Sequence, residues 1–229
     1  MSAATLSRPR THVARCDRLD DLSAIKSEDV NLALWPRRLP AALATSIEAH
    51  RARPISGEAW FDACDGEAST AGHYAVLLRD VASSDRAMWQ ADIEPLVRLF
   101  AAVSAAHVVR ATIETVTGSG CRKFHVDHVG LRLLCTYDGT GTQWAPEAAV
   151  RRAMLAVGDN EDIVTDTTRV ETMARGDVGL FKGEAWPGNI GRGSVHRSPP
   201  EPKAGHRRVL LCLDAGMADH SRLGRMTRV

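Results

Sequence analysis

The stretch of sequence that decides the fold runs over residues 121–144 and reads CRKFHVDHVGLRLLCTYDGTGTQW. Two histidines and an aspartate stand near its start, an apolar run follows, and a turn rich in glycine and threonine comes near its end. An apolar run bounded by turn residues predicts a buried β-strand. Residues two apart on a strand point to the same side, so His125 and Asp127 could present an imidazole and a carboxylate to one ion. The stretch therefore predicts a strand with a candidate metal site beside it.

The composition limits the class of protein. The 229 residues suit one large domain, and 29 basic against 28 acidic residues leave a net charge of +1, which gives no sign of a nucleic-acid or membrane-surface partner. Five cysteines without a C-x-x-C pair favour a reducing compartment over a disulfide framework. No segment approaches the roughly 18 apolar residues that a membrane helix needs. We therefore expect a cytoplasmic protein with no nucleic-acid and no membrane partner.

The periodicity of the apolar residues changes once along the chain. Residues 1–27 contain several arginines but no apolar segment, and we expect a flexible N-terminal tail there. No linker-like boundary follows, so residues 28–229 are interpreted as a single domain. Within it, residues 28–106 are expected to be mainly helical, and residues 107–216 to form a β-rich core.

The expected helical part begins with a short strand at residues 30–35, VNLALW, which a proline closes. Residues 39–52 have the proline start and the alanine content of a helix. A second helix is indicated by apolar residues at positions i, i+3, i+4 and i+7, a spacing that places them on one side of a helix. These residues are Ile93, Leu96, Val97 and Phe100. We interpret this apolar stripe as core and not as a cofactor contact.

From residue 107 onward, β-branched and apolar residues alternate between turn residues, a pattern typical of strands. Several short strands of this kind indicate a β-sandwich or barrel. We therefore predict an α+β fold, a C-terminal double-stranded β-helix (jelly-roll) covered by N-terminal helices. The YDGTGT segment at residues 137–142 is interpreted as a hairpin turn. The strands are expected within residues 107–118, 129–137, 169–173, 177–183, 193–198 and 207–214.

Taken alone, His125 and Asp127 are weak evidence for a metal, because a chain of this composition contains roughly 0.7 H-x-D pairs by chance. A distant His196, followed by Arg207 and Arg208 at the start of the next strand, strengthens the case. Two imidazoles and one carboxylate form the facial triad that suits non-heme Fe(II) and leaves coordination positions open. An arginine can pair bidentately with the far carboxylate of a chelating 2-oxo acid. The two arginines point to opposite faces of a strand, and we favour Arg208 for this role.

Several segments carry a resemblance to known families. HVDHVGLRLL, GDVGLFKG, VHRSPP and RRVLLCLD resemble the double-stranded β-helix of the Fe(II)/2-oxoglutarate-dependent oxygenases over roughly the last half of the chain. More closely, NLALW, KFHVDHVGLRLLCTYDGTGTQW and WPGNIGRGSVHRSPP resemble the domain of unknown function 1826 family over most of its length. That resemblance implies a link to metal-chaperone GTPases and a role in metal homeostasis. Asn is usual in that family at the position of His128, so His128 departs from the pattern.

Two functions stay open at this point. One is an Fe(II)/2-oxoglutarate-dependent dioxygenase (hydroxylase) acting on a small molecule or a protein. The other is a non-catalytic zinc-binding jelly-roll protein that acts in metal homeostasis. No Ser-His-Asp arrangement with an elbow motif is present, which argues against a hydrolase.

Further residues are candidates for secondary roles. Cys121 stands four positions before His125 and could be a zinc ligand, although a free cysteine is more often a small core residue, as we also expect for Cys212. Four residues in glycine- and proline-containing segments could contact a substrate or could cap the barrel. They are Trp144, Trp186, Asn189 and Arg192.

Overall fold

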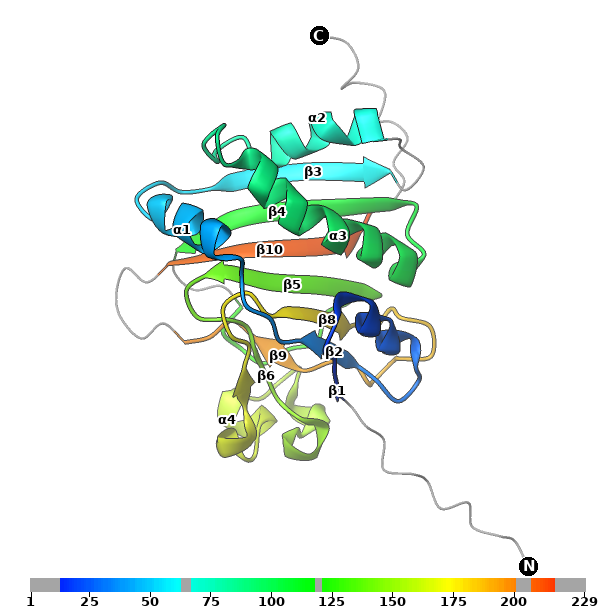
Figure 1. Cartoon of the computed structure of the whole chain (residues 1–229). Coiled ribbons are helices and arrows are strands. Elements are labelled where there is room, and N and C mark those ends of the chain that lie inside the picture. Colours follow the sequence, from blue (N-terminus) through cyan, green and yellow to red (C-terminus); the bar gives the residue numbers. More distant parts are fainter. Residues whose placement is uncertain (1–12, 63–66, 118–120, 201–206, 217–229) are drawn as a thin grey trace, which may run out of the picture.

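The structure of the chain, a computed structural model, describes residues 13–62, 67–117, 121–200 and 207–216 (Figure 1). Its main feature is a large twisted sheet, with a small sheet packed beside it. The large sheet has the order β1 (Val13–Arg15), β2 (Leu32–Trp35), β8 (Val178–Lys182), β5 (Leu131–Asp138), β10 (Arg207–Ala215), β4 (Val108–Thr117), β3 (Ser56–Asp62). The small sheet has the order β7 (Glu171–Thr172), β6 (Gln143–Trp144), β9 (His196–Arg197). The α+β jelly-roll that the sequence predicted is confirmed.

The strands of the large sheet pair antiparallel, except for the parallel pair β1 and β2. Along β10 the residues alternate between the two faces, so that Leu211 and Leu213 are fully buried on one face while Leu210 and Cys212 lie half-buried on the other. The same alternation holds in β4, where Ala111 and its odd-numbered neighbours are buried. The sheet therefore has one apolar face and one mixed face, as expected for period-2 patterning.

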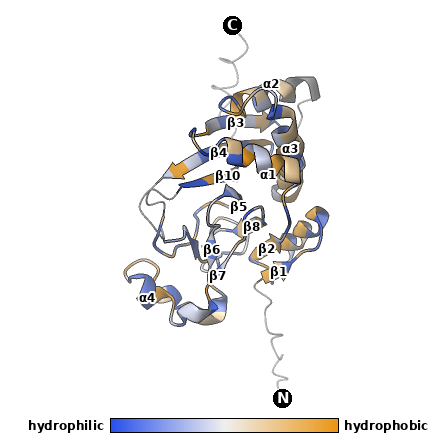
Figure 2. Ribbon diagram, turned by 60° about the vertical axis from the view of Figure 1, so that its left-hand side comes forward, coloured by the Kyte–Doolittle hydropathy of each residue, from blue (hydrophilic) through white to orange (hydrophobic). Residues whose placement is uncertain are grey.

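Three helices cover the apolar face: α1 (Ala41–Ala49), α2 (Glu67–Leu77) and α3 (Arg86–Ser104). Figure 2 shows them together on one side of the large sheet, with the small sheet on the other side. The apolar stripe predicted from the sequence lies on α3 and is buried in the core that this helix forms with the sheet. None of the helices in the described ranges combines the length and the apolar character needed to cross a lipid bilayer.

A segment with short helices follows β6 and packs around its own small core, which includes Phe124, Ile163 and Val195. In Figure 1 it projects from the end of the molecule that carries the small sheet. Its elements are η2 (Glu147–Ala149), η3 (Arg152–Met154), α4 (Asn160–Ile163) and η4 (Thr167–Arg169).

The N-terminal segment differs from the flexible tail that we expected. Residues 13–15 form β1, and the 3-10 helix η1 (Leu19–Lys26) packs against β2 and α3. Leu22 and Ile25, three positions apart on η1, are fully buried. This short apolar pair anchors the segment, because burial of two aliphatic side chains offsets the loss of chain entropy. Residues 1–12 of the expected tail lie outside the described part of the chain.

Two further expectations are corrected in the β-strands. The part expected to be mainly helical also contributes β3, which pairs along its whole length with β4. The YDGTGT segment does not close a hairpin, because β6 pairs with β7 and β9 and not with β5. It carries the chain from the large sheet to the small one. Gly139 adopts a positive φ of 83° there, and a Cβ atom at Gly141 would lie 2.1 Å from the carbonyl oxygen of Met173.

Candidate metal centre and adjoining pocket

Backbone pairing brings the two predicted histidine ligands together. His125 and His196 form an isolated antiparallel bridge, and each backbone N–H donates to the carbonyl of the other residue at 3.0 Å. The centroids of their imidazole rings are 4.6 Å apart. His196 lies in β9 as predicted, whereas His125 lies just outside the strands, and the bridge joins its backbone to β9. Two residues far apart in sequence thus face one point.

Asp127 lies at the same point. Its Oδ2 atom is 3.4 Å from Nε2 of His196, and its Oδ1 atom is 3.9 Å from Nε2 of His125. One potential ligand atom from each of the three residues lies within 4.8 Å of the others. Metal–ligand distances of about 2.0–2.2 Å place neighbouring ligand atoms roughly 3 Å apart. The three side chains can therefore hold one divalent cation after only small movements.

The hydrogen bonds of the imidazole rings leave the correct nitrogen free for a metal. Nδ1 of His125 donates to the carbonyl of Lys123 at 2.8 Å, and Nδ1 of His196 donates to the carbonyl of Ser194 at 3.0 Å. A carbonyl only accepts, so Nδ1 carries the proton in both neutral rings, and the lone pair of each Nε2 is available for a metal. Burial lowers the pKa of His196 to about 4. The ring is therefore neutral and able to bind a metal at neutral pH.

The carboxylate of Asp127 has one satisfied and one unsatisfied oxygen. Oδ1 accepts a hydrogen bond from Nη1 of Arg132 at 2.7 Å. Oδ2 is buried and, among the described residues, has no hydrogen-bond donor. An unsatisfied buried carboxylate oxygen is costly, and a cation bound between Asp127 and the two histidines would remove this cost. The donor set of two neutral imidazoles and one carboxylate thus fits a divalent metal such as Fe(II).

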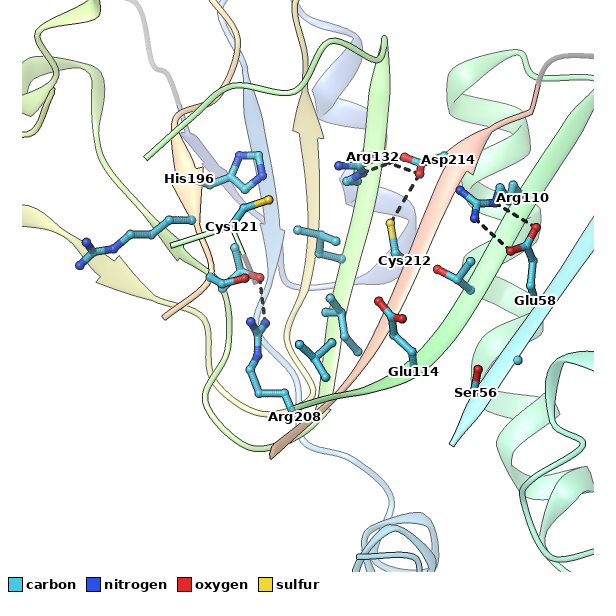
Figure 3. Close-up of a pocket in the computed structure, with 18 of the residues that line it drawn as sticks. Ser56, Glu58, Arg110, Glu114, Cys121, Arg132, His196, Arg208, Cys212 and Asp214 are labelled. Carbon is cyan, nitrogen blue, oxygen red and sulfur yellow. Dashed lines mark hydrogen bonds and ion pairs between the residues drawn. The ribbon is translucent and has the colours of Figure 1, made fainter. Parts of the chain in front are cut away.

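A cavity of about 570 Å³, lined in part by His125 and His196, lies on the mixed face of the large sheet, opposite the helices (Figure 3). Its floor is formed by outward-facing residues of β10 and β4, and β3 contributes to its far wall. Ion pairs occupy part of this floor, such as Arg110 with Glu58. The volume is that of an ordinary small-molecule site.

Arg208 reaches into this cavity from β10, and its side chain is buried. Its Nη2 atom donates to the hydroxyl oxygens of Thr136 at 3.2 Å and Thr142 at 3.3 Å. Its Nε atom has no acceptor among the described residues, and no carboxylate of those residues forms an ion pair with it. Desolvation lowers the pKa of Arg208 to about 10. The guanidinium therefore remains charged at neutral pH and is free to pair with an incoming anion.

Arg207 lies on the other face of the same strand. Its Nη2 atom donates to the carbonyl oxygens of His50 and Arg53, both at 3.2 Å. The cavity is lined by Arg208 and not by Arg207.

The four residues considered for substrate contacts do not line the cavity. Trp144 is buried between the sheets in a cluster with Leu134 and Phe181. Trp186 packs against the main core, and the ammonium of Lys182 lies 5.3 Å from its ring centroid. Trp144 therefore has a structural position, because its large apolar surface is buried, and Trp186 is partly buried against the core.

Asn189 and Arg192 also hold the backbone together. The amide Nδ2 of Asn189 donates to the carbonyl of Gly183 at 3.0 Å, and Nη2 of Arg192 donates to the carbonyl of Glu28 at 2.7 Å. The sequence could not distinguish such loop-closing hydrogen bonds from substrate contacts, since both use exposed-looking polar residues between glycines.

Cys121, Cys212 and His128 lie near the candidate metal site but are not among its candidate ligands. Cys121 is exposed and lines the cavity, but its Sγ atom is not part of the group of ligand atoms that could hold a metal. His128 is exposed and also outside that group. Cys212 was expected in the core, whereas it lines the cavity and is half-buried. The alternation of Arg208, Leu210 and Cys212 on one strand face was the signal that could have placed it there.

Sequence reasoning missed Arg132 and Asp214, two charged residues of the cavity floor. Each stands in an apolar strand segment, Arg132 in LRLL and Asp214 at the end of LLCLD. A charged residue within a strand that is otherwise apolar signals either a solvated face or a functional side chain. Here both residues face the cavity.

The chain has a jelly-roll fold, which the Fe(II)/2-oxoglutarate-dependent dioxygenases also have, with a His-x-Asp…His group beside the barrel pocket. The family model described as protein of unknown function (DUF1826) matches residues 16–214. The chain belongs to this family, as the resemblance in its sequence had indicated. No curated protein matches the sequence.

Solved structures with a similar fold include three dioxygenase or hydroxylase structures. The Arabidopsis thaliana dioxygenase for auxin oxidation 1, in a binary complex with 2-oxoglutarate, superposes with a TM-score of 0.51 at 9% identity, covering 90% of this chain and 93% of that one. The rice dioxygenase for auxin oxidation gives a TM-score of 0.49 at 15% identity, covering 88% and 78%. A Pseudomonas putida prolyl-4-hydroxylase gives 0.42 at 13% identity, covering 86% and 97%. The similarity to the Arabidopsis enzyme, at 9% identity, describes the fold alone.

Proposed function

We propose that this protein is an Fe(II)/2-oxoglutarate-dependent dioxygenase that hydroxylates its substrate. His125, Asp127 and His196 would hold Fe(II), and Arg208 would bind the distal carboxylate of 2-oxoglutarate. The observation that carries the proposal is a buried, charged arginine without an anionic partner among the described residues, in a cavity that is also lined by His125 and His196 of the candidate ligand group. A structural zinc site, in contrast, is closed by four protein ligands.

Each of these residues has a defined task in the proposed reaction. The two neutral imidazoles donate their Nε2 lone pairs, and the carboxylate of Asp127 neutralises one positive charge. Three protein ligands leave coordination positions open, and when bound, Fe(II) and 2-oxoglutarate supply the activation of O₂ and the oxidation of the substrate. The guanidinium of Arg208 orients the cosubstrate by a charge-assisted pair, which is strong because the residue is buried.

The hydroxyls of Thr136 and Thr142 support Arg208. Both threonines are almost fully buried, and both accept from the same guanidinium nitrogen. Since Nη1 bonds to neither hydroxyl and Nε has no acceptor in the described part of the chain, the remaining donors of the fork stay available for a carboxylate. Preorganisation of this kind lowers the entropy that ligand binding would otherwise cost.

The test is anaerobic reconstitution of the full chain with Fe(II), followed by addition of 2-oxoglutarate. We expect a weak visible charge-transfer band on addition and slow formation of succinate once O₂ is admitted. A matched experiment with the His196→Ala variant should show neither signal. Tight binding of zinc with no response of the Fe(II) protein to 2-oxoglutarate would contradict the proposal and favour a non-catalytic zinc-binding role in metal homeostasis.

A further inference from the structure

Arg132 links Asp127 to a second carboxylate, that of Asp214. Figure 3 shows the pair that Arg132 forms with Asp214. Its Nη1 atom donates to Oδ1 of Asp127 at 2.7 Å. Its Nε and Nη2 atoms donate to Oδ1 and Oδ2 of Asp214 at 2.8 Å and 3.0 Å. One guanidinium thus makes a bidentate pair with one aspartate and a single hydrogen bond with the other.

The register of the sheet fixes this arrangement. Arg132 on β5 and Asp214 on β10 are direct partners in the antiparallel ladder. Two parallel hydrogen bonds to a carboxylate set both the position and the plane of a guanidinium, because its nitrogen atoms are coplanar and rigidly joined. The remaining nitrogen, Nη1, can then point in one direction only, and in this structure it points at Asp127.

Asp127 does not lie in a β-strand, so strand pairing does not fix its position. It lies in an irregular segment two residues after the bridge at His125. Its side chain could therefore rotate, or could offer both oxygens to a metal, unless another group restrains it. The bond from Arg132 occupies Oδ1 and leaves Oδ2, the oxygen that lies 3.4 Å from Nε2 of His196, for a cation.

We propose that Arg132, oriented by Asp214, is a positioning residue that fixes Asp127 as a ligand through one oxygen. A carboxylate that binds through one oxygen uses one coordination position and leaves the others open to small molecules. The inference rests on the metal site of the proposed function, but not on the identity of the reaction. Groups that orient metal ligands from outside the coordination sphere commonly change metal affinity by about 10–100-fold when removed.

A second ion pair on the same cavity floor provides the matched control. Arg110 on β4 makes a bidentate pair with Glu58 on the neighbouring strand, with bonds of 3.2 Å and 3.0 Å. Both residues line the cavity, and among the described residues the guanidinium of Arg110 donates to Glu58 and to none of the three candidate metal ligands. If these cross-strand ion pairs only stabilise the sheet, substitutions of Arg132 and of Arg110 should have the same effect on metal affinity.

The experiment measures binding of Co(II), used alone as the probe, to the full chain and its variants by titration and visible absorption. The main variant is Arg132→Lys, which keeps the charge but lacks the planar fork, so that electrostatic attraction of the cation stays constant. We expect Co(II) affinity to fall about tenfold or more, with a changed absorption band. Asp214→Asn should give the same change in the band, and Arg110→Lys should match the wild type in both measurements.

A double variant shows whether Arg132 acts through Asp127. In an Asp127→Asn background, Arg132→Lys should change Co(II) affinity less than twofold, because the carboxylate that it orients is gone. Wild-type affinity and an unchanged band in folded Arg132→Lys, or an equal loss in Arg110→Lys, would overturn the inference. A wild-type protein that does not bind Co(II) would overturn the metal site and this inference together. Normal Co(II) results without any response to 2-oxoglutarate would leave the inference standing and remove the proposed reaction.

Discussion

Arg207 and Arg208 are consecutive on β10, yet their guanidinium groups lie on opposite faces of the sheet. Arg208 bonds to Thr136 and Thr142 in the cavity, and Arg207 bonds to the backbone at His50 and Arg53 on the helical side. Arg208 can therefore be tested for binding of 2-oxoglutarate, and Arg207, the same residue type on the same strand, serves as its control.

The first prediction uses this pair of arginines. Replacing Arg208 with Leu should weaken 2-oxoglutarate binding to the metal-loaded protein by more than tenfold, since losing a buried charge-assisted pair costs about 2–5 kcal/mol. Metal affinity should remain nearly intact, because among the described residues Arg208 bonds to none of the three candidate metal ligands. Titration calorimetry with 2-oxoglutarate measures the effect. Arg207→Leu should have little effect, and negligible changes in both variants would rule out the carboxylate clamp.

The second prediction concerns the stability of the ligand-free protein. The pKa of Arg208 falls to about 10 on folding. The unfolded chain therefore binds the proton of this guanidinium more tightly than the folded chain does. As a result, the buried charge lowers the free energy of unfolding at every pH below about 10. The depressed pKa corresponds to roughly 3 kcal/mol, which the hydrogen bonds to the two threonines partly offset. Arg208→Met keeps most of the packing and should raise the free energy of unfolding by about 1 kcal/mol at pH 7.5.

Thermal unfolding without ligand measures this gain. Arg207→Met is the control, since its guanidinium satisfies two backbone carbonyls, and its loss should lower stability or leave it unchanged. The prediction is wrong if Arg208→Met unfolds at a lower temperature than the wild type. Above pH 10 the difference between wild type and Arg208→Met should shrink, because the folded protein then loses the charge.

The third prediction tests the three ligands against a neighbouring histidine. His196→Ala should reduce Co(II) or Fe(II) affinity by at least a hundredfold, because a site with one imidazole and one carboxylate lacks its third ligand. His128→Ala should leave metal affinity unchanged, since His128 is exposed and lies outside the group of ligand atoms. Metal titration monitored by absorption provides the measurement. A large loss of affinity in His128→Ala would show that the metal binds elsewhere.

The fourth prediction concerns two cysteines that line the same cavity. Burial, and next the nearby carboxylate of Asp214, raise the pKa of the Cys212 thiol. The thiol is therefore protonated at pH 8 and reacts slowly with iodoacetamide, whose target is the thiolate. Cys121 is exposed and should be alkylated first. Peptide mapping by mass spectrometry after a short reaction measures both sites, and equal labelling of Cys212 in the folded protein would contradict its buried position.

Much of the fold could be predicted because it depends on local patterns. The alternation in the segments that become β4, β5, β8 and β10 and the helical spacing on α3 are properties of consecutive residues. The same alternation was enough to place Arg207 and Arg208 on opposite faces of β10. The His-x-Asp spacing likewise named two of the three candidate ligands.

The sequence was least informative where a residue's environment comes from distant parts of the chain. Trp144 has an aromatic surface that could serve a substrate or a core, and its burial follows from the packing of the small sheet on the large one. Leu22 and Ile25 stand in a polar, charged segment, and only their contact with the sheet makes that segment ordered. The pattern of consecutive residues does not reveal these contacts, because they join segments that are far apart in the sequence.

By itself, the sequence determined the strands β4, β5, β8 and β10, the opposite faces of Arg207 and Arg208, and the chemistry of the candidate ligands, because these depend on chirality, pleat and residue type. The tertiary structure decided that His125 and His196 exchange backbone hydrogen bonds and that Arg132 reaches both Asp127 and Asp214. Strand register is the physical reason: hydrogen-bonded pairing of strands far apart in sequence sets which side chains meet, and the pairing is fixed by the packing of the whole sheet.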